Sequence, residues 1–419
     1  MSNRKPPHII VGAGLAGARA AQALRDEGCD ESIVLIGTEP DHPYERPPLS
    51  KDYLQGKADR DSIKVHPDRW YADHDVELRL STEVTGLDPV AHQVSLADGD
   101  RLRYSKLLLT TGSTPRRLTV PGADLDGVLS LRSVGDSGRI RDTLSRSARV
   151  AIIGAGWIGL EAAAAARAAG VDVTVLETAS LPLSRVLGPQ VAQSFADLHR
   201  AHGVDLRCGV QVAGLTGASG QVTGVLLGDG SLTEADAVIV GVGITPNTRL
   251  AEQARLDVDN GIRVDASLRS SHPDVYAAGD VANAFHPLLG KHIRVEHWAN
   301  AVNQPVVAAQ AMLGQDATYQ RLPYFFTDQY DLGMEYVGYT EPGGYRDVVI
   351  RGDMGSGKFI AFWLAADRRV LAGMNVNTWD VNDAIRDLIS TREPMDPARL
   401  ADPGVALGEL IDTVSARSR

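Results

Sequence analysis

Two glycine-rich turns constrain what this chain can fold into more than any other feature. GAGLAG at Gly12–Gly17 follows the apolar run His8–Val11, and GAGWIG at Gly154–Gly159 follows Val150–Ile153. In such turns the first glycine ends a strand, the second lets backbone N–H groups approach a pyrophosphate, and the third lets a helix pack closely. One copy would also suit a turn that only packs a helix on a strand. Two copies, 142 residues apart in equivalent settings, predict two bound dinucleotides.

Each turn is followed at a suitable distance by an acidic residue that could hold a ribose hydroxyl. Glu39 lies 22 positions after Gly17, and Glu177 lies 18 positions after Gly159. A carboxylate accepts a hydrogen bond from a free 2′-hydroxyl but repels a 2′-phosphate, so Glu177 favours NADH over NADPH. Arg185 is near enough in sequence to leave NADPH as an open alternative.

The composition is typical of a soluble α/β protein with room for about three domains. The net charge of −11 argues against a nucleic acid partner, because phosphate binding requires concentrated Lys and Arg. The longest uncharged run, His297–Gln315, contains too many Asn and Gln residues for a membrane span. Residues 1–7 lack the apolar stretch of a signal peptide. We therefore expect a cytoplasmic protein without membrane insertion.

The spacing of the cysteines is informative. Only Cys29 and Cys208 are present, and they are too far apart in sequence to form a CxxC or metal-ligand pattern. We expect no metal site, no structural disulfide and no thiol relay.

The strands and turns around the fingerprints predict an α/β fold with two Rossmann-like dinucleotide-binding domains. Strands are expected at Leu107–Thr110 and Ala237–Val242, each followed by a similar turn, Thr111–Pro115 and Gly243–Asn247. The second domain is therefore expected to be inserted into the first. The predicted limits are 1–117 and 246–322 for the first domain, 118–245 for the second, and 323–419 for a C-terminal α+β domain with a weakly structured tail.

Further elements are expected in the second half of the chain. A strand at Val275–Ala278 and a helix over residues 296–312 would complete the first domain. The alternating pattern of the C-terminal domain predicts strands at Asp347–Arg351, Lys358–Leu364 and Val370–Met374, then a helix near Val381–Ser390.

A stiff, charged loop, YERPPLSK at Tyr44–Lys51, follows the first fingerprint. Its two prolines restrict the backbone and remove two hydrogen-bond donors. Ser50 is expected to cap a short helix over Lys51–Leu54. Arg46 and Lys51 could each serve a cofactor or simply be solvated on a surface turn.

These motifs resemble one family. The pieces GAGLAG, YERPPLSKDYL, LLLTTGSTPR, VAIIGAGWIGLE, VIVGVGITPN, VYAAGD, VEHWANAVNQ and YFFTDQYD occur between residue 8 and about residue 331. In this order they resemble the bacterial FAD-dependent NADH–ferredoxin reductases, the group of putidaredoxin reductase and rhodocoxin reductase in the glutathione-reductase-like flavoprotein superfamily. The ERPPLSK loop is the most discriminating piece.

The resemblance implies FAD on the first domain. It places Lys51 beside the reactive ring nitrogen, Asp280 at the ribityl chain or phosphate, and Trp298 against the flavin. Taken alone, Asp280 could cap a helix and Trp298 could be a core residue. The implied FAD-binding residues are Gly12, Gly14, Leu15, Ala16, Gly17, Glu39, Arg46, Lys51, Val84, Thr111, Gly112, Arg132, Gly279, Asp280 and Trp298.

NAD(H) is the implied ligand of the second domain. Glu161 falls where the family orients the nicotinamide, although an acid in the first turn of a helix is also favourable without a ligand. Lys51, Glu161 and Trp298 are thus the implied catalytic residues. The implied NAD-binding residues are Gly154, Gly156, Trp157, Ile158, Gly159, Glu161, Glu177, Arg185 and Gly243.

The chain departs from the family pattern at two points. Thr38, where an acid is common, precedes Glu39, so the ribose contact could be shifted. Phe326 stands where the family often has tryptophan. Residues beyond 331 match only loosely.

The implied activity is electron transfer from NADH through FAD to a small iron–sulfur ferredoxin that supplies an oxygenase. Because no dithiol is present, the electrons must leave for an acceptor outside the chain. An acidic ferredoxin would need a basic patch; the candidates are Arg346, Arg351, Lys358, Arg368 and Arg369. The alternatives are an NADH oxidase or quinone reductase, a redox-sensing protein resembling apoptosis-inducing factor, and a non-catalytic dinucleotide-binding module. The oligomeric state stays open.

Overall fold

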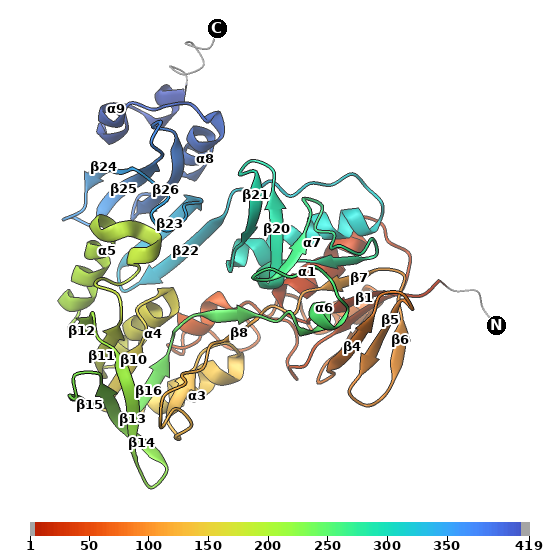
Figure 1. Ribbon diagram of the computed structural model, residues 1–419, viewed down its shortest axis with the longest axis horizontal. Coiled ribbons are helices and arrows are strands. Elements are labelled where there is room, and N and C mark those ends of the chain that lie inside the picture. The colour runs from red at the N-terminus through yellow and green to blue at the C-terminus, as the bar shows by residue number, and fades with distance from the viewer. Residues whose placement is uncertain (1–4, 412–419) are drawn as a thin grey trace. The chain divides into compact units, whose positions relative to one another are not determined.

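The computed structural model describes residues 5–411 (Figure 1). These residues form two compact units, each assembled from separate parts of the chain. The first unit contains the chain up to Pro48, Ala58–Thr114 and Ile244–Arg321. The second contains Leu49–Lys57, Pro115–Gly243 and the chain from Leu322 onward.

A parallel five-stranded sheet organises the first unit, in the order β19-β7-β1-β2-β3. Its central strand β1 is buried along its whole length, as expected for a parallel strand covered on both faces. Helix α1 follows β1 directly and packs against α7. The bounds are β1 His8–Val11, α1 Leu15–Asp26, β2 Ile33–Ile36, β3 Val76–Arg79, β7 Leu107–Leu109, β19 Val275–Ala277 and α7 Trp298–Met312.

Smaller elements complete the first unit. Two three-stranded sheets have the orders β4-β5-β6 and β18-β20-β21, and β17 pairs with β8 where the chain leaves and re-enters the unit. The bounds are α2 Trp70–Asp73, β4 Val84–Asp88, β5 Gln93–Leu96, β6 Arg101–Arg103, β8 Ser113–Pro115, β17 Ile244–Pro246, α6 Arg249–Gln253, β18 Ile262–Val264, η2 Gly279–Val281, β20 Ala282–His286 and β21 Lys291–Arg294. The 3₁₀ turn η1, Pro47–Ser50, spans the point where the chain passes from the first unit to the second.

The second unit repeats the arrangement of the first. Its parallel sheet has the order β12-β11-β10-β16-β9, with the glycine turn again after the central strand. The bounds are β9 Val128–Ser130, α3 Val134–Leu144, β10 Arg149–Ile153, α4 Trp157–Ala168, β11 Asp172–Glu177, α5 Ser184–Ala201, β12 Asp205–Cys208, β13 Val212–Ala218, β14 Gln221–Leu227, β15 Leu232–Glu234 and β16 Ala237–Val240.

An antiparallel sheet in the order β22-β23-β26-β25-β24 forms the C-terminal part of the second unit. Helix α8 packs against β23 and β26, and α9 packs against β24. The bounds are β22 Tyr324–Gln329, β23 Leu332–Gly338, β24 Asp347–Asp353, β25 Lys358–Leu364, β26 Val370–Val376, α8 Asn382–Thr391 and α9 Pro397–Ala401.

The predicted fold class is confirmed: two Rossmann-like parallel sheets and a C-terminal α+β part are present. Two parts of the predicted domains lie outside the described residues: residues 1–4, at the start of the first domain, and residues 412–419, in the expected tail of the C-terminal domain. Within residues 5–411, no helix has both the length and the apolar character that a membrane crossing requires.

The prediction of a short helix over Lys51–Leu54 is wrong. The chain instead forms the 3₁₀ turn η1 over Pro47–Ser50, and turns follow it. Proline fixes φ near the value of such a turn, so the two prolines bring the helical turn forward. The hydroxyl of Ser50 caps no helix; it donates to Glu161 at 2.5 Å.

Candidate functional site

The first glycine turn has the shape that a dinucleotide pyrophosphate requires. Gly12 has a φ of +120°, and a Cβ there would lie 2.1 Å from the carbonyl oxygen of Thr110. A Cβ on Gly17 would lie 2.0 Å from the carbonyl oxygen of Gly12. Around Gly14, by contrast, an added Cβ would meet no described atom within 4 Å apart from the local backbone and its chain neighbours. Only the middle glycine therefore faces open space, the place where a phosphate approaches the backbone.

The second turn divides its glycines in the same way. Gly154 has a φ of +100°, and its Cβ would lie 2.4 Å from the carbonyl oxygen of Gly241. A Cβ on Gly159 would lie 2.0 Å from the carbonyl oxygen of Gly154, whereas that of Gly156 meets none of the described atoms within 4 Å. Both turns thus fit a bound dinucleotide.

The first residues of helices α1 and α4 carry the remaining fingerprint side chains. Leu15 and Ala16 are buried at the start of α1. At the start of α4, the ring of Trp157 lies 5.1 Å from that of Phe325, and Ile158 is exposed. Their backbone N–H groups lie at the positive end of each helix, where an anion is stabilised.

Glu39 lies in a polar cluster with two residues of the ERPPLSK loop. Arg46 donates to its carboxylate at 2.9 Å, and the hydroxyl of Tyr44 donates to it as well. The Glu39 side chain keeps 37% of its surface exposed. It can therefore accept a further hydrogen bond from a ligand hydroxyl.

The AAGD segment lies against the first glycine turn. Gly279 has a φ of +81°, its N–H donates to Gln304 at 2.8 Å, and a Cβ there would lie 3.2 Å from the Cβ of Ala16. Asp280 accepts a hydrogen bond from Ser113 at 2.8 Å. The structure thus brings Asp280 to the turn that the sequence assigned to the same cofactor.

The other implied residues of the first unit occupy element ends. Thr111 donates to the carbonyl oxygen of Asn247 at 2.8 Å, and Gly112 accepts from the N–H of Asn247 at 3.0 Å. Val84 begins β4, and Trp298 begins α7. The sequence did not single out Ser113 and Gln304, because only the folded chain brings them to Asp280 and Gly279.

A buried carboxylate in the second unit, that of Glu161, gathers partners from three parts of the chain. Glu161 belongs to α4 and is 5% exposed. The hydroxyls of Ser50 and Thr327 donate to it, each at 2.5 Å, and the ammonium of Lys51 lies 3.1 Å away. Burying a charge is costly unless it is paired and hydrogen-bonded, and this carboxylate has both kinds of partner.

Lys51 has further partners on β22. Its nitrogen lies 3.8 Å from a carboxylate oxygen of Asp328 and 4.6 Å from the ring centroid of Phe326. A cation over an aromatic face is stabilised by the ring quadrupole. Phe326, which departs from the family pattern, therefore contacts the lysine of the discriminating loop.

Thr327 and Asp328 were missed as candidate residues. The segment YFFTDQYD was part of the resemblance, but nothing in its spacing linked it to Lys51 or Glu161. The two residues alternate in burial along β22, with Thr327 buried and Asp328 exposed. A polar residue at a buried position of a strand was the available signal.

Glu177 lies directly at the second turn. Its carboxylate accepts from the N–H of Ala155 at 2.7 Å and from the N–H of Ala179 at 2.8 Å. The acid therefore holds the second glycine turn in place.

The remaining NAD-domain candidates show different surroundings. Arg185 is exposed near the start of α5. Gly243, with a φ of +97°, accepts from the N–H of Arg116 at 2.9 Å. The N–H of Arg132, a residue implied for FAD, donates to Asp136 at 3.1 Å beside the N-terminal cap of α3.

Neither thiol has the lowered pKa of an activated nucleophile. Burial raises the pKa of Cys29 and of Cys208 above the usual value, and neither is in a disulfide. A thiol with a raised pKa is a poor nucleophile.

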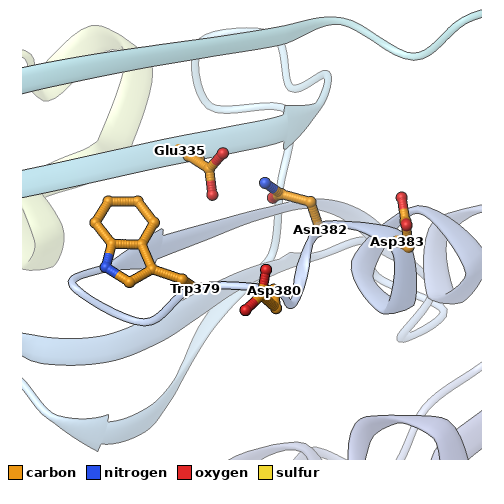
Figure 2. Close-up of a pocket in the computed structure, with 5 residues that line it drawn as sticks. All are labelled: Glu335, Trp379, Asp380, Asn382 and Asp383. Carbon is orange, nitrogen blue, oxygen red and sulfur yellow. The ribbon is translucent and has the colours of Figure 1, made fainter.

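One pocket in the C-terminal sheet region is lined by acidic side chains (Figure 2). It has a volume of about 290 Å³, and its lining residues are Glu335, Trp379, Asp380, Asn382 and Asp383. Three carboxylates repel phosphate, so this pocket does not suit a dinucleotide.

Two glycine turns on two Rossmann-like sheets, each shaped to receive a pyrophosphate, are typical of an oxidoreductase that uses two dinucleotides. Residues 6–305 match the family described as pyridine nucleotide-disulphide oxidoreductase, and residues 324–411 match the family described as reductase C-terminal. The chain belongs to the pyridine nucleotide-disulphide oxidoreductase family.

Similar proteins cover nearly the whole chain. The ferredoxin–NAD(+) reductase component of the anthranilate 1,2-dioxygenase system of Burkholderia cepacia is 42% identical over 96% of this chain and 98% of its own length. Rhodocoxin reductase of Rhodococcus erythropolis is 38% identical over 94% of this chain and 92% of its own. The predicted resemblance is therefore confirmed.

Solved structures agree with this assignment. The covalent complex of putidaredoxin reductase with putidaredoxin superposes with a TM-score of 0.94 at 37% identity, covering 99% of this chain and 100% of that one. A water-forming NADH oxidase from Lactobacillus brevis reaches a TM-score of 0.86 over 99% of each chain, but at 22% identity it shows the fold alone.

Proposed function

We propose that this chain carries electrons from NADH through FAD to a small iron–sulfur ferredoxin, which supplies an oxygenase. One observation carries the proposal: a single chain holds two glycine cradles, each with its middle glycine open, and its only two cysteines lie in different units. Two dinucleotides can exchange a hydride, and without a dithiol the electrons must pass to an external acceptor. The names of the full-length relatives support ferredoxin as that acceptor.

The first cradle is proposed to hold FAD and the second NAD(H). Gly14 and the start of α1 would receive the FAD pyrophosphate, with Glu39 at a ribose hydroxyl and Asp280 at the ribityl chain or phosphate. Gly156 and the start of α4 would receive the NADH pyrophosphate, with Glu177 at the ribose. Bound FAD would supply the conversion of a two-electron donor into two one-electron transfers.

The protein's own part in this reaction is placement and electrostatics. Lys51 is proposed as the cation beside the flavin, where it would stabilise negative charge that develops on reduction. Glu161 holds the Lys51 ammonium at 3.1 Å and is itself held by two hydroxyls. The lysine is thereby positioned before any ligand binds, as electrostatic stabilisation requires.

The C-terminal domain is proposed to contribute to ferredoxin docking. Arg346, Lys358 and Arg368 are exposed and can steer an acidic partner. Arg351 is committed elsewhere, because its guanidinium donates to backbone carbonyl oxygens of residues 400–405, including Asp402 at 2.7 Å. We also propose the domain limits predicted from the sequence and a cytoplasmic location.

Anaerobic stopped-flow spectroscopy tests the proposed function. The purified yellow protein should be bleached rapidly by NADH, more slowly by NADPH, and reoxidised by a ferredoxin from the same host. If NADH bleaches the flavin but oxygen or a quinone reoxidises it faster than every ferredoxin tried, the proposed acceptor is wrong. The protein would then be an NADH oxidase or a quinone reductase. A long-lived charge-transfer band with slow turnover would instead indicate the redox-sensing alternative, and no bleaching at all would leave a dinucleotide-binding module.

A further inference from the structure

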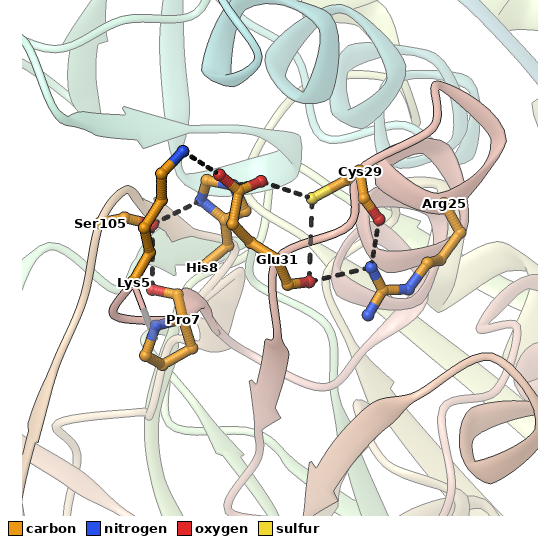
Figure 3. A network of polar contacts seen from close by, with 7 residues as sticks. All are labelled: Lys5, Pro7, His8, Arg25, Cys29, Glu31 and Ser105. Carbon is orange, nitrogen blue, oxygen red and sulfur yellow. Dashed lines mark hydrogen bonds and ion pairs between the residues drawn. The ribbon is translucent and has the colours of Figure 1, made fainter. Parts of the chain in front are cut away.

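Three side chains of types that can bind a metal ion converge in the first unit (Figure 3). His8 begins β1, while Cys29 and Glu31 lie in the loop between α1 and β2. One ligand atom from each, the histidine nitrogen, the thiol sulfur and a carboxylate oxygen, all lie within 4.8 Å of one another. This group could not be recognised from the sequence, because Cys29 and Cys208 do not have the spacing of a known metal-binding motif.

Two of the three distances within the group are close to the edges of a tetrahedral zinc site. Oε2 of Glu31 lies 3.6 Å from Nε2 of His8 and 3.5 Å from Sγ of Cys29. Zinc binds nitrogen and oxygen at about 2.0–2.1 Å and sulfur at about 2.3 Å, so tetrahedral ligand atoms lie roughly 3.3–3.5 Å apart. An ion can enter with small side-chain shifts.

The histidine nitrogen that faces the group lacks a hydrogen-bond partner among the described residues. His8 is 4% exposed, and its Nε2 is buried. Its other ring nitrogen, Nδ1, lies 3.1 Å from the hydroxyl of Ser105, which holds the ring with Nε2 toward Glu31 and Cys29. A ligating histidine is commonly held in this way through its second nitrogen.

Basic residues around the group order its backbone and leave the ligand atoms available. Arg25 donates to the carbonyl oxygens of Cys29, at 2.5 Å, and Glu31, at 2.9 Å, and thus holds the loop that carries both residues. Lys5 pairs with Oε1 of Glu31 at 3.0 Å, leaving Oε2 for the group. A thiolate, a carboxylate and a neutral imidazole together carry the two negative charges that balance a divalent cation.

We propose that His8, Cys29 and Glu31 form a binding site for a divalent zinc ion, with water at the fourth position. The mixed nitrogen, sulfur and oxygen donor set suits this borderline-soft ion, whereas calcium and magnesium take oxygen ligands. The Glu31 side chain is 27% exposed and provides access from solvent. The site is separate from both glycine cradles, and its occupation requires no electron transfer.

Zinc binding to the flavin-containing protein tests the proposal. After treatment with a chelator, the wild-type chain should bind one Zn²⁺ in equilibrium dialysis. The variants Cys29→Ser and His8→Gln should bind at least about ten-fold more weakly. Cys208→Ser, which changes the only other cysteine, is the matched control and should bind as the wild type does.

Cobalt supplies a second measurement that needs no variant. Co²⁺ bound by a thiolate in tetrahedral geometry gives intense d–d bands at red wavelengths, where oxidised flavin absorbs little. The wild-type protein should show these bands, and added Zn²⁺ should remove them. Wild-type protein without such bands would overturn the proposal, as would equal zinc affinity in Cys29→Ser and the wild type.

Discussion

The ammonium of Lys51 lies 3.1 Å from the carboxylate of Glu161, although the two residues are far apart in the sequence. Both side chains are largely buried, at 13% and 6% exposure, and Glu161 also accepts hydrogen bonds from Ser50 and Thr327. These contacts join Ser50 and Lys51 to α4 and β22 within the second unit. The most discriminating sequence motif and the start of the second Rossmann-like helix are thus parts of one electrostatic arrangement.

Replacing Glu161 should destabilise the protein and slow its reduction by NADH. Glu161→Ala leaves the ammonium of Lys51 without its buried partner, a change that costs about 3–5 kcal/mol. The urea midpoint and the anaerobic bleaching rate should both fall. Asp328→Asn is the matched control, because Asp328 lies 3.8 Å from the same ammonium but is 60% exposed. An exposed pair contributes about 0–1 kcal/mol, so equal effects of the two variants would contradict the assigned importance of the buried pair.

Replacing the middle glycine of the second turn should weaken coenzyme binding and leave folding nearly unchanged. Gly156→Ala adds a methyl group to open space, so folding should change little while the KM for NADH rises at least about ten-fold. Gly138→Ala, in helix α3, also enters open space and should leave KM unchanged. Gly159→Ala should unfold the protein, since its Cβ would lie 2.0 Å from a carbonyl oxygen. Steady-state kinetics and urea unfolding together separate these outcomes. A normal KM for NADH in Gly156→Ala would contradict the proposal that the second glycine turn binds the NADH pyrophosphate.

Much of this fold follows from local rules that can be applied to the sequence. The strand predicted at His8–Val11 and the one at Lys358–Leu364 have the observed bounds, because short apolar runs between turns specify strands. The expected strand at Ala237–Val242 ends earlier, at Val240, where the chain turns at Gly241. Glycine turns are equally local, so both cradles could be predicted.

The polar clusters could not be predicted, because they depend on residues that meet only in the folded chain. Ser50 was expected to cap a helix, and its true partner, Glu161, lies 111 residues away. Thr327 is 166 residues from the same carboxylate. His8 meets Cys29 and Glu31 because β1 pairs with the strand that follows their loop. No spacing rule links such positions.

Glu177 should set the preference for NADH. Its removal in Glu177→Ala eliminates both the acceptor for a 2′-hydroxyl and the repulsion of a 2′-phosphate, so the ratio of kcat/KM for NADH to that for NADPH should fall at least about ten-fold. The kcat/KM for NADH should itself fall in this variant, because the Glu177 carboxylate also holds the second glycine turn by accepting from the N–H of Ala155 at 2.7 Å. Arg185→Ala is the companion variant and should lower NADPH use alone. An unchanged coenzyme ratio in Glu177→Ala would remove the argument for NADH.

Stability should fall as the pH drops from 6.5 toward 4, partly because of His199. Burial lowers the pKa of this histidine from 6.5 to about 4, while its Nε2 pairs with Gln329 at 2.8 Å. In this pH range the unfolded chain binds a proton that the folded chain excludes. Unfolding is therefore favoured increasingly as the pH falls, by up to on the order of 3 kcal/mol for this one group.

His199→Gln should remove part of this pH dependence, since glutamine does not titrate but can still donate to Gln329. Urea unfolding at a series of pH values should give a flatter curve for this variant between pH 6.5 and 4, with little change in slope above pH 7. His202→Gln is the companion variant, because the charge of the neighbouring His202 also lowers the pKa of His199. Since burial is the larger cause, its curve should be flattened less than that of His199→Gln. Parallel curves for wild type and His199→Gln would show that another buried group causes the acid sensitivity.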